Sequence, residues 1–294
     1  MSPARESQHF LQIHIDVARN ATDDFNPFHD PVRWSNIRNN PFDGPIALGF
    51  QLEGLIADRL EQFRAANGEL ELIQRERLHY SNFEFRFVGA VRPGQLLTLT
   101  IKPSRFRPGV EAVLSNRVSL YADGKLVLTG YKRESRTPCC EQGQEIRLPD
   151  DLQQLPDRMF VENEELFLKR KFINTDGAKN FLCACLVEQW KYIDELAEKV
   201  RIPEMFPCSL ISCSLLERAW AQGHDFERQP LVYQSHALSI DRRVLDDVRS
   251  NNVLHLLNRP LCVDGPSSSY QVYGVVGANA LLFTGKIDLL ALGE

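Results

Sequence analysis

The segment 46–66 constrains the fold more than any other part of the sequence. Its apolar residues recur at helical spacing, and its first half is apolar on nearly every side. Such a helix is stable only where other elements surround it, so we predict a long helix enclosed by the rest of a domain. Asn67 and Gly68 follow where a helix C-cap is expected. The apolar positions are Ile46, Phe50, Leu52, Leu55, Ile56, Leu60 and Phe63.

Strand-like segments flank this predicted helix. Segment 9–16 alternates apolar and polar residues as a strand does, and 31–40 is expected to form a short helix followed by a polar loop. The dipeptide Asp123-Gly124 is typical of a tight hairpin turn. Four strands are predicted after the long helix, at 82–88, 96–101, 110–121 and 125–134. The order is therefore strand, buried helix and antiparallel meander.

A similar order returns in the second part of the chain. The polar segment 138–157 has no period, so we predict a linker between domains at 1–137 and 158–294. The second domain is expected to contain a strand at 166–173, helices at 178–200 and 206–220, and strands at 231–240, 253–263, 270–276 and 280–290.

Two short strings support a duplication. Leu126-Val-Leu-Thr-Gly130 returns as Leu281-Leu-Phe-Thr-Gly285, and Thr22-Asp23 returns as Thr175-Asp176 at nearly the same offset. Matching offsets predict a repeated module.

Composition argues against several classes of partner. The 294 residues carry a net charge of -5, so no positive field favours nucleic acid. No apolar stretch approaches the length of a membrane span, and the N-terminus lacks the apolar core of a signal peptide. The seven cysteines lack the spacing of a disulfide framework or metal site. We therefore expect a cytoplasmic protein with buried, reduced thiols, no membrane partner and no metal.

Two short segments concentrate groups suited to catalysis. Asn20 to His29 contains two acids, an amide, a proline and an imidazole, and Gly44 to Gly49 opens the buried helix. A carboxylate, an imidazole and a helix N-terminus can together perform acid–base chemistry beside a carbonyl. Asp24 could instead cap a turn without catalysing. The presence of His29 and the glycine segment favours the catalytic interpretation.

Other polar residues favour structural interpretations. Ser209, Ser212 and Ser214 lack the Gly-x-Ser-x-Gly context of a serine nucleophile. Five histidines are interpreted as ordinary strand or loop residues, namely His14, His79, His224, His236 and His255.

Three motifs resemble those of the MaoC-like (R)-specific enoyl-CoA hydratases and dehydratases. That family carries Asp-x-Asn-Pro-(aliphatic)-His followed by Gly-Pro-Ile-Ala-His-Gly. The corresponding motifs are Asp24-Phe-Asn-Pro-Phe-His29, Gly44-Pro-Ile-Ala-Leu-Gly49 and Arg86-Phe-Val-Gly-Ala-Val-Arg-Pro-Gly-Gln-Leu96. The resemblance implies an α+β double hotdog fold, with two tandem modules that each wrap a curved antiparallel sheet around a long helix.

The resemblance also implies roles for individual residues. Asp24 and His29 would be the catalytic pair that adds water to a trans-2-enoyl thioester, giving an (R)-3-hydroxyacyl thioester, or reverses this reaction. Asp24 would take the proton of the water, and His29 would orient the water and move a proton to C2. The backbone N–H of Gly49 would stabilise the thioester oxygen. The substrate-binding positions would be Asn26, Gly44, Pro45, Ile46, Ala47 and Leu48.

The sequence departs from the family pattern at several positions. Leu48 replaces the histidine of Gly-Pro-Ile-Ala-His-Gly, and Ala57 lies where some members carry a serine. When the second half is aligned on Thr175-Asp176, Gly177 and Leu182 take the catalytic positions. The C-terminal module is therefore expected to be inactive and to supply wall, acyl pocket and pairing surface.

The sequence thus predicts a hydro-lyase that acts on thioesters of coenzyme A or of an acyl carrier protein. No separate cofactor is expected, because coenzyme A or the carrier protein is part of the substrate. Two chains could pair as a homodimer. A hotdog thioesterase and a non-catalytic acyl-thioester-binding subunit are the alternatives.

Overall fold

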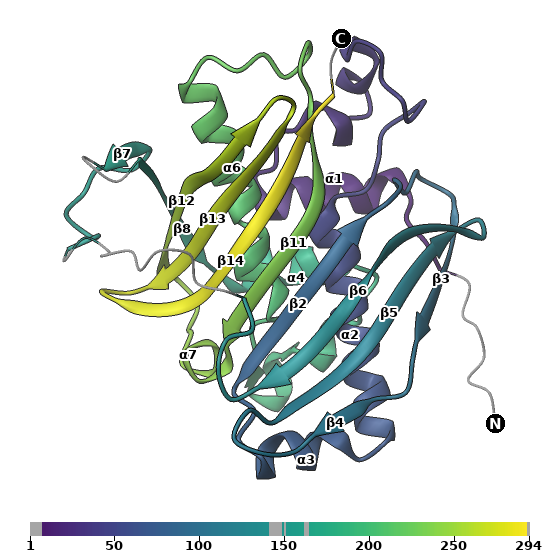
Figure 1. Ribbon diagram of the computed structural model, residues 1–294, viewed down its shortest axis with the longest axis vertical. Helices are drawn as coiled ribbons and strands as arrows, with labels where there is room; N and C mark the ends of the chain where they lie inside the picture. The colour runs from purple at the N-terminus through teal and green to yellow at the C-terminus, as the bar shows by residue number, and fades with distance from the viewer. Residues whose placement is uncertain (1–7, 141–148, 150, 162–164, 293–294) are drawn as a thin grey trace.

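One curved antiparallel sheet runs through both halves of the computed structural model (Figure 1). The structure describes residues 8–140, 149, 151–161 and 165–292. Within them the strand order is β1-β3-β5-β6-β2-β11-β14-β13-β12-β8-β7, and β4 also pairs with β5. The first half contributes β1 (Gln8–His9), β2 (Tyr80–Phe87), β3 (Leu96–Ile101), β4 (Arg105–Arg107), β5 (Val113–Ala122) and β6 (Lys125–Ser135). The second half contributes β7 (Met159–Val161), β8 (Leu166–Ile173), β11 (Leu231–Asp241), β12 (Asn252–Asp264), β13 (Ser267–Val276) and β14 (Ala280–Ala291).

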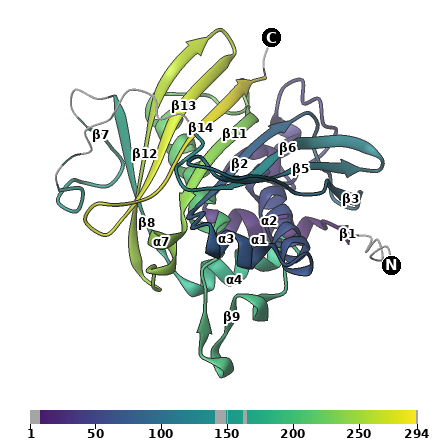
Figure 2. The same ribbon diagram turned by 60° about the horizontal axis from the view of Figure 1, so that its bottom comes forward.

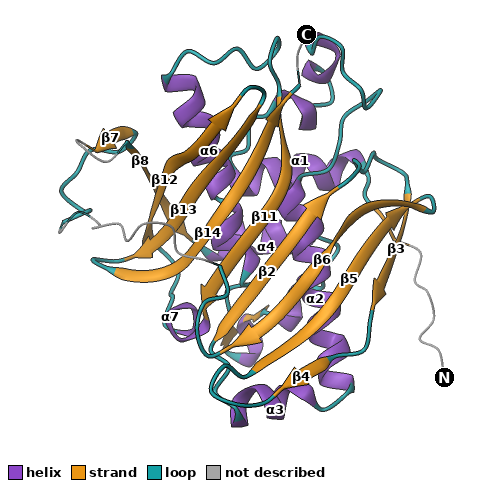
Figure 3. Cartoon of the chain, in the orientation of Figure 1, coloured by secondary structure: helices purple, strands orange, loops and turns teal. Residues whose placement is uncertain are grey.

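The main helices lie on one face of this sheet (Figures 2 and 3). Every residue of α2 from Gly49 to Ile56 is buried, which confirms the predicted enclosed helix, although α2 begins at Gly49 instead of Ile46. Gly68 adopts a left-handed φ of 68° directly after the C-cap residue Asn67, as predicted. The α-helices are α1 (Gln12–Thr22), α2 (Gly49–Ala66), α3 (Glu69–Arg75), α4 (Thr175–Ala184), α5 (Met205–Ser209), α6 (Ile211–Ala221) and α7 (Arg242–Asp246).

Shorter elements complete the fold. The helix expected within 31–40 is the 3₁₀-helix η2, and the predicted Asp123-Gly124 turn joins β5 to β6 with positive φ at both residues. The 3₁₀-helices are η1 (Pro27–His29), η2 (Arg33–Asn36), η3 (Gln189–Lys191) and η4 (Glu195–Ala197), and a separate hairpin pairs β9 (Ile193–Asp194) with β10 (Lys199–Val200).

The predicted strand at 9–16 is wrong, because most of this segment belongs to α1. The buried side chains of α1 are Ile15, Ala18 and Thr22, which share one helix face, whereas Ile13 is 59% exposed. The alternation that suggested a strand therefore does not follow burial.

Both predicted helices of the second half are interrupted. The helix expected at 178–200 ends at Ala184, because Leu186 adopts a left-handed φ of 57°. The helix expected at 206–220 is broken between α5 and α6. There the Ser209 hydroxyl donates to the Phe206 carbonyl, which the next turn of an unbroken helix would use.

Two further expectations concern the linker and the cysteines. Much of the predicted linker at 138–157 lies outside the described residues. Among the described residues the cysteines form no disulfide, and Cys185, Cys208 and Cys213 are buried as expected, but Cys139, Cys183 and Cys262 are exposed. Among the described residues, no helix is both long enough and apolar enough to cross a membrane.

The two halves join where β2 pairs with β11. The repeated strings occupy equivalent positions in β6 and β14, since Gly130 faces β2 and Gly285 faces β11 in matching registers. An approximate two-fold axis passes between Glu84 and Ala237, which are equivalent residues and also pair with each other. A Cβ atom on Gly130 would lie 1.9 Å from the Glu84 carbonyl oxygen, and one on Gly285 2.6 Å from that of Ala237. The close approach of the neighbouring strand therefore excludes a side chain at both Gly130 and Gly285.

A buried cluster of charges lies beside the last turns of α2. Glu134 of β6 is fully buried and contacts Arg64, Lys132 and Arg242, with 2.7 Å between Arg242 Nη1 and Glu134 Oε2. Burial alone would raise the pKa of Glu134, but the charges of Arg242, Lys132 and Arg64 lower it to about 2. The network therefore holds a carboxylate charged inside the protein.

Replacing Gly130 tests whether the neighbouring strand excludes a side chain at this position. We expect Gly130→Ala to lower the free energy of unfolding by about 1–3 kcal/mol or more, because strand β2 must move to admit the methyl group. Urea unfolding measures this, with Gly89→Ala as the control, since a Cβ there has no contact shorter than 3.4 Å. Equal stability of the two variants would contradict the steric explanation.

The Glu134 network predicts a pH dependence of stability. Because the folded pKa lies below the ordinary value of 4.5, its contribution is complete above that value and is lost as the pH falls toward about 2. We expect Glu134→Gln to be less stable than wild type by about 3 kcal/mol near neutral pH, and this difference to shrink through that window. Urea unfolding at a series of pH values measures it, and a difference independent of pH would contradict the assignment.

Candidate active site

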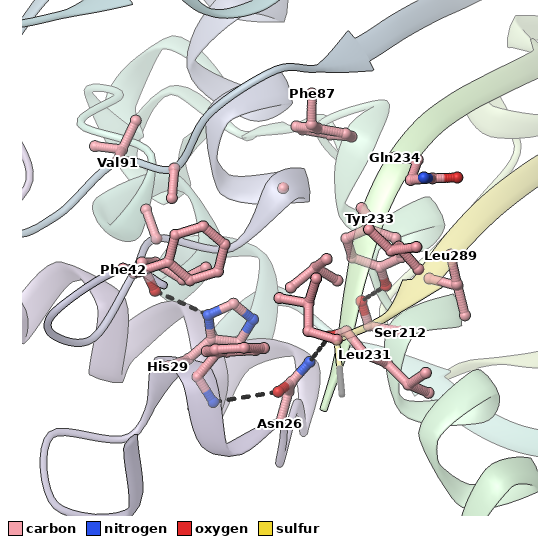
Figure 4. A pocket seen from close by; sticks show the side chains of 18 of the residues that line it. Asn26, His29, Phe42, Phe87, Val91, Ser212, Leu231, Tyr233, Gln234 and Leu289 are labelled. Carbon is pink, nitrogen blue, oxygen red and sulfur yellow. Dashed lines mark hydrogen bonds between the residues drawn. The ribbon is translucent and has the colours of Figure 1, made fainter. Parts of the chain in front are cut away.

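A cavity of about 330 Å³ lies between the two halves of the chain (Figure 4). The first half supplies the segment between α1 and α2 and the end of β2, and the second half supplies α6, the start of β11 and the end of β14. Most of the lining is apolar, and the charged or polar groups include Asp24, Asn26 and His29.

The turn after α1 fixes Asp24. The Oδ1 atom of Asp24 accepts the N–H of Asn26 at 2.9 Å, and the Oδ1 atom of Asn26 accepts the N–H of Phe28 at 3.2 Å, where Pro27 begins η1. Asp24 therefore does cap a turn. Its side chain is nevertheless 4% exposed and lines the cavity, and among the described residues no donor contacts its other oxygen. One carboxylate oxygen is structural and the other is available.

The ring of His29 is held in one orientation. Its Nδ1 atom lies 2.8 Å from the carbonyl oxygen of Ile46. A carbonyl can only accept, so Nδ1 carries a proton, and in the neutral ring Nε2 keeps a lone pair. Figure 4 shows this contact at the wall of the cavity. His29 can therefore act as a base through Nε2.

The cavity also sets the charge of His29. Burial lowers the pKa of His29, against the opposing effects of the Asp24 carboxylate and of the hydrogen bond to Ile46. The imidazole is therefore neutral near pH 7, and Asp24 stabilises the charged form that appears when the ring takes up a proton.

The glycine segment connects this turn to α2. The N–H of Ile46 donates to the Phe28 carbonyl at 2.9 Å, and that of Ala47 donates to the Val91 carbonyl at 2.8 Å. Gly49 is the first residue of α2, so its N–H lies outside the hydrogen-bond ladder of the helix. A Cβ atom on Gly49 would lie 2.9 Å from Phe87 Cζ, so glycine allows the helix end to approach the cavity wall.

The predicted site residues do not all lie together. Six of them line the cavity, namely Asp24, Asn26, His29, Ile46, Ala47 and Gly49. Leu48 is buried and does not line it, whereas Gly44 and Pro45 line a separate surface hollow beside Arg92.

The second half contributes polar groups that sequence reasoning missed. The Nδ2 atom of Asn26 donates to the Leu231 carbonyl at 2.8 Å, which ties the turn to β11. The hydroxyl groups of Tyr233 and Ser212 form a hydrogen bond with each other at the cavity wall (Figure 4). Burial and then the charge of Asp24 raise the pKa of Tyr233, so its hydroxyl keeps its proton. No motif in the sequence marked either residue, because Tyr233 on β11 and Ser212 on α6 reach the cavity only through the tertiary fold.

The alignment of the two halves at Thr22-Asp23 and Thr175-Asp176 is wrong. Thr22 ends α1, whereas Thr175 begins α4. The better match to Asp24 is Val187, because each donates its N–H to the carbonyl five residues earlier, directly after a residue with positive φ.

The same comparison locates the counterpart of His29. Lys191 ends η3 as His29 ends η1. The matching pair in the second half is therefore Val187 and Lys191 instead of Gly177 and Leu182. The expected lack of a carboxylate–imidazole pair holds at these positions too.

The two-fold axis relates the first cavity to a second one of about 480 Å³. This cavity lies at the opposite end of the β2–β11 pair and is lined by charged groups that include Arg64, Lys132, Glu204 and Arg242. Glu204 contacts both Lys132 and Arg242 there. The two ends of the duplicated fold thus carry different chemistry.

No protein-family model matches the sequence, and no curated protein sequence matches it. Solved structures do match over nearly the whole chain. A MaoC-like dehydratase matches with a TM-score of 0.58 at 10% identity, over 97% of this chain and 95% of the other. A conserved hypothetical protein from Mycobacterium tuberculosis, described as having a double hotdog fold, matches with a TM-score of 0.59 at 11% identity, over 98% and 94% of the two chains.

A third similar structure is the peroxisomal multifunctional enzyme type 2 of Drosophila melanogaster. Its TM-score is 0.59 at 11% identity, over 97% of this chain and 48% of that enzyme. These similarities show that the chain has a double hotdog fold, which confirms the α+β architecture expected from the resemblance to MaoC-like proteins. Identities this low support the fold and carry no residue roles.

The buried environment of His29 predicts its titration. We expect a midpoint below the ordinary value of 6.5, because burial disfavours the charged ring. In Asp24→Asn the midpoint should fall further, since the carboxylate is what raises it. Histidine NMR measures both, and His29→Gln identifies the signal. A midpoint above 6.5, or a rise in Asp24→Asn, would contradict this electrostatic description.

Proposed function

We propose that the chain is a hydro-lyase that hydrates trans-2-enoyl thioesters to (R)-3-hydroxyacyl thioesters, or dehydrates them in reverse. One observation carries the proposal: Asp24 and His29 are both buried on the wall of an apolar cavity that also contains the N-terminal end of α2. The three motif resemblances and the double hotdog fold support it.

The thioester oxygen would lie against the N–H of Gly49. Electron density moves to this oxygen when a nucleophile adds at C3, so a free N–H at a positive helix end stabilises the reacting state more than the ground state. The apolar lining from the second half, such as Leu215, Leu231 and Leu289, would hold the acyl chain.

Water would lie between the free oxygen of Asp24 and Nε2 of His29. As the water oxygen bonds to C3, Nε2 takes one of its protons, and the resulting imidazolium returns that proton to C2 of the enolate. Asp24 accepts a hydrogen bond from the other water proton and stabilises the imidazolium. This gives His29 the proton transfer that the resemblance assigned to Asp24, because the Nδ1 contact to Ile46 leaves Nε2 as the basic atom.

The substrate carrier would be coenzyme A or an acyl carrier protein, since both present the same thioester. Neither the apolar lining nor the acid–base pair distinguishes between them.

Substitutions of the pair test this function. We expect Asp24→Asn and His29→Gln each to lower kcat by about 10²–10⁴, because the first removes the charge that stabilises the imidazolium and the second removes the group that transfers the proton. Enoyl absorbance and free thiol are followed together with short- and medium-chain trans-2-enoyl-CoA, and acyl-carrier-protein thioesters are tested next. Asp23→Asn is the matched control, because Asp23 is the adjacent acid, exposed and paired with Lys171.

The two signals separate the alternatives. Loss of the enoyl signal without thiol release supports the hydro-lyase. Thiol release would instead indicate a thioesterase, and binding without turnover of any thioester would indicate an acyl-binding subunit. Wild-type rates in either variant of the pair would contradict the site.

A further inference from the structure

A second acid–imidazole pair is buried behind the cavity wall. Glu53 of α2 and His236 of β11 are both 0% exposed, and Glu53 Oε1 lies 2.8 Å from His236 Nδ1. Neither residue lines the cavity. The pair therefore lies outside the set of groups that would touch a substrate.

Three aromatic rings surround the imidazole of His236. The centroids of Tyr233, Phe50 and Phe87 lie 4.3, 4.5 and 5.0 Å from its own. The planes of Tyr233 and Phe87 are inclined to the imidazole by 79° and 75°, and that of Phe50 by 31°. A protonated ring forms an ion pair with Glu53 across this contact.

This arrangement has a cost in stability. Among the described residues, Glu53 Oε2 and His236 Nε2 have no hydrogen-bond partner. An apolar pair of similar volume would avoid both the unmade hydrogen bonds and the desolvation of two charges. A buried pair of this kind is therefore weak evidence for a contribution to stability.

The pair lies next to the end of α2 that faces the cavity. Glu53 follows Gly49 by four residues, so it is on the same helix face about 6 Å further along the axis. The rings of Phe87 and Tyr233, which contact His236, are also the groups closest to a Cβ atom built on Gly49.

A lone carboxylate at Glu53 would oppose the proposed reaction. Its negative charge would offset the positive end of the helix and repel the charge that develops on a thioester oxygen at Gly49. A cation at His236 cancels this field at short range.

We propose that His236 is the counter-charge of Glu53 and keeps the N-terminus of α2 available to the thioester oxygen. His236 is then a positioning residue, because it acts through the helix end and not on the substrate. This inference rests on the proposed hydro-lyase function.

Four proteins test the proposal: wild type, Glu53→Gln, His236→Asn and the double variant. Asparagine keeps an N–H near the Nδ1 position, so the hydrogen bond can remain while the positive charge is lost. We expect His236→Asn to lower kcat roughly tenfold or more with little change in KM, because the unbalanced charge acts on the developing oxyanion. In Glu53→Gln, kcat should fall less than in His236→Asn. In the double variant, kcat should return most of the way to the wild-type value.

Binding and stability are measured on the same proteins. The affinity for a saturated acyl-CoA should be unchanged throughout, because it carries no developing charge. A purely structural role predicts instead that KM rises and the affinity for the saturated ligand falls when kcat falls. That result, or equal kcat in His236→Asn and the double variant, would overturn the proposal.

A final readout needs no turnover. The buried carboxylate left alone in His236→Asn should lower the midpoint of thermal unfolding below that of the double variant. Failure of wild type to consume any enoyl thioester would contradict the proposed function, whereas loss of this stability pattern would contradict the ion pair itself. The two failures are therefore distinguishable.

Discussion

The pairing of β2 with β11 is the interaction on which the candidate site depends. It places the start of β11, with Leu231 and Tyr233, against the turn that carries Asp24 and His29. The Asn26–Leu231 hydrogen bond fastens that turn to the partner half. Without this central pairing each half would leave its helix uncovered on one side and its cavity without a wall. The site is therefore a property of two modules together, even though the first alone carries the acid and the imidazole.

Local signals in the sequence predicted much of the fold. The enclosed helix was predicted from residues that are apolar on nearly every side. The turn at Asp123-Gly124 was predicted from two residue types that tolerate a left-handed backbone. Errors arose where a periodic pattern did not correspond to burial, as in α1, or where one backbone conformation ended a helix, as at Leu186. The alignment of the two halves at Thr175 was wrong for a similar reason. Two residue types matched at a fixed offset, but Thr22 ends a helix and Thr175 begins one.

For the candidate site, the sequence revealed only the residues that lie close together in the chain. Asp24, Asn26 and His29 lie within six positions, so their chemistry was visible in the sequence. Tyr233 of β11 and Ser212 of α6 come from the other half, and only the tertiary fold brings them to the same cavity, while His236 of β11 lies behind its wall. One signal was present but unused: Glu53 is an isolated acid in the apolar first half of α2, and a charge in such a place needs a partner from elsewhere.

Because both modules belong to one chain, the two ends of the β2–β11 pair can evolve separately. In a dimer of identical hotdogs, every substitution appears at both sites. Here one end keeps an apolar cavity with a carboxylate and an imidazole, and the other holds a network around Glu134. The covalent connection also makes the assembly independent of concentration, since neither half can be diluted away from the other. A protein of this construction should keep a complete site even when it is scarce.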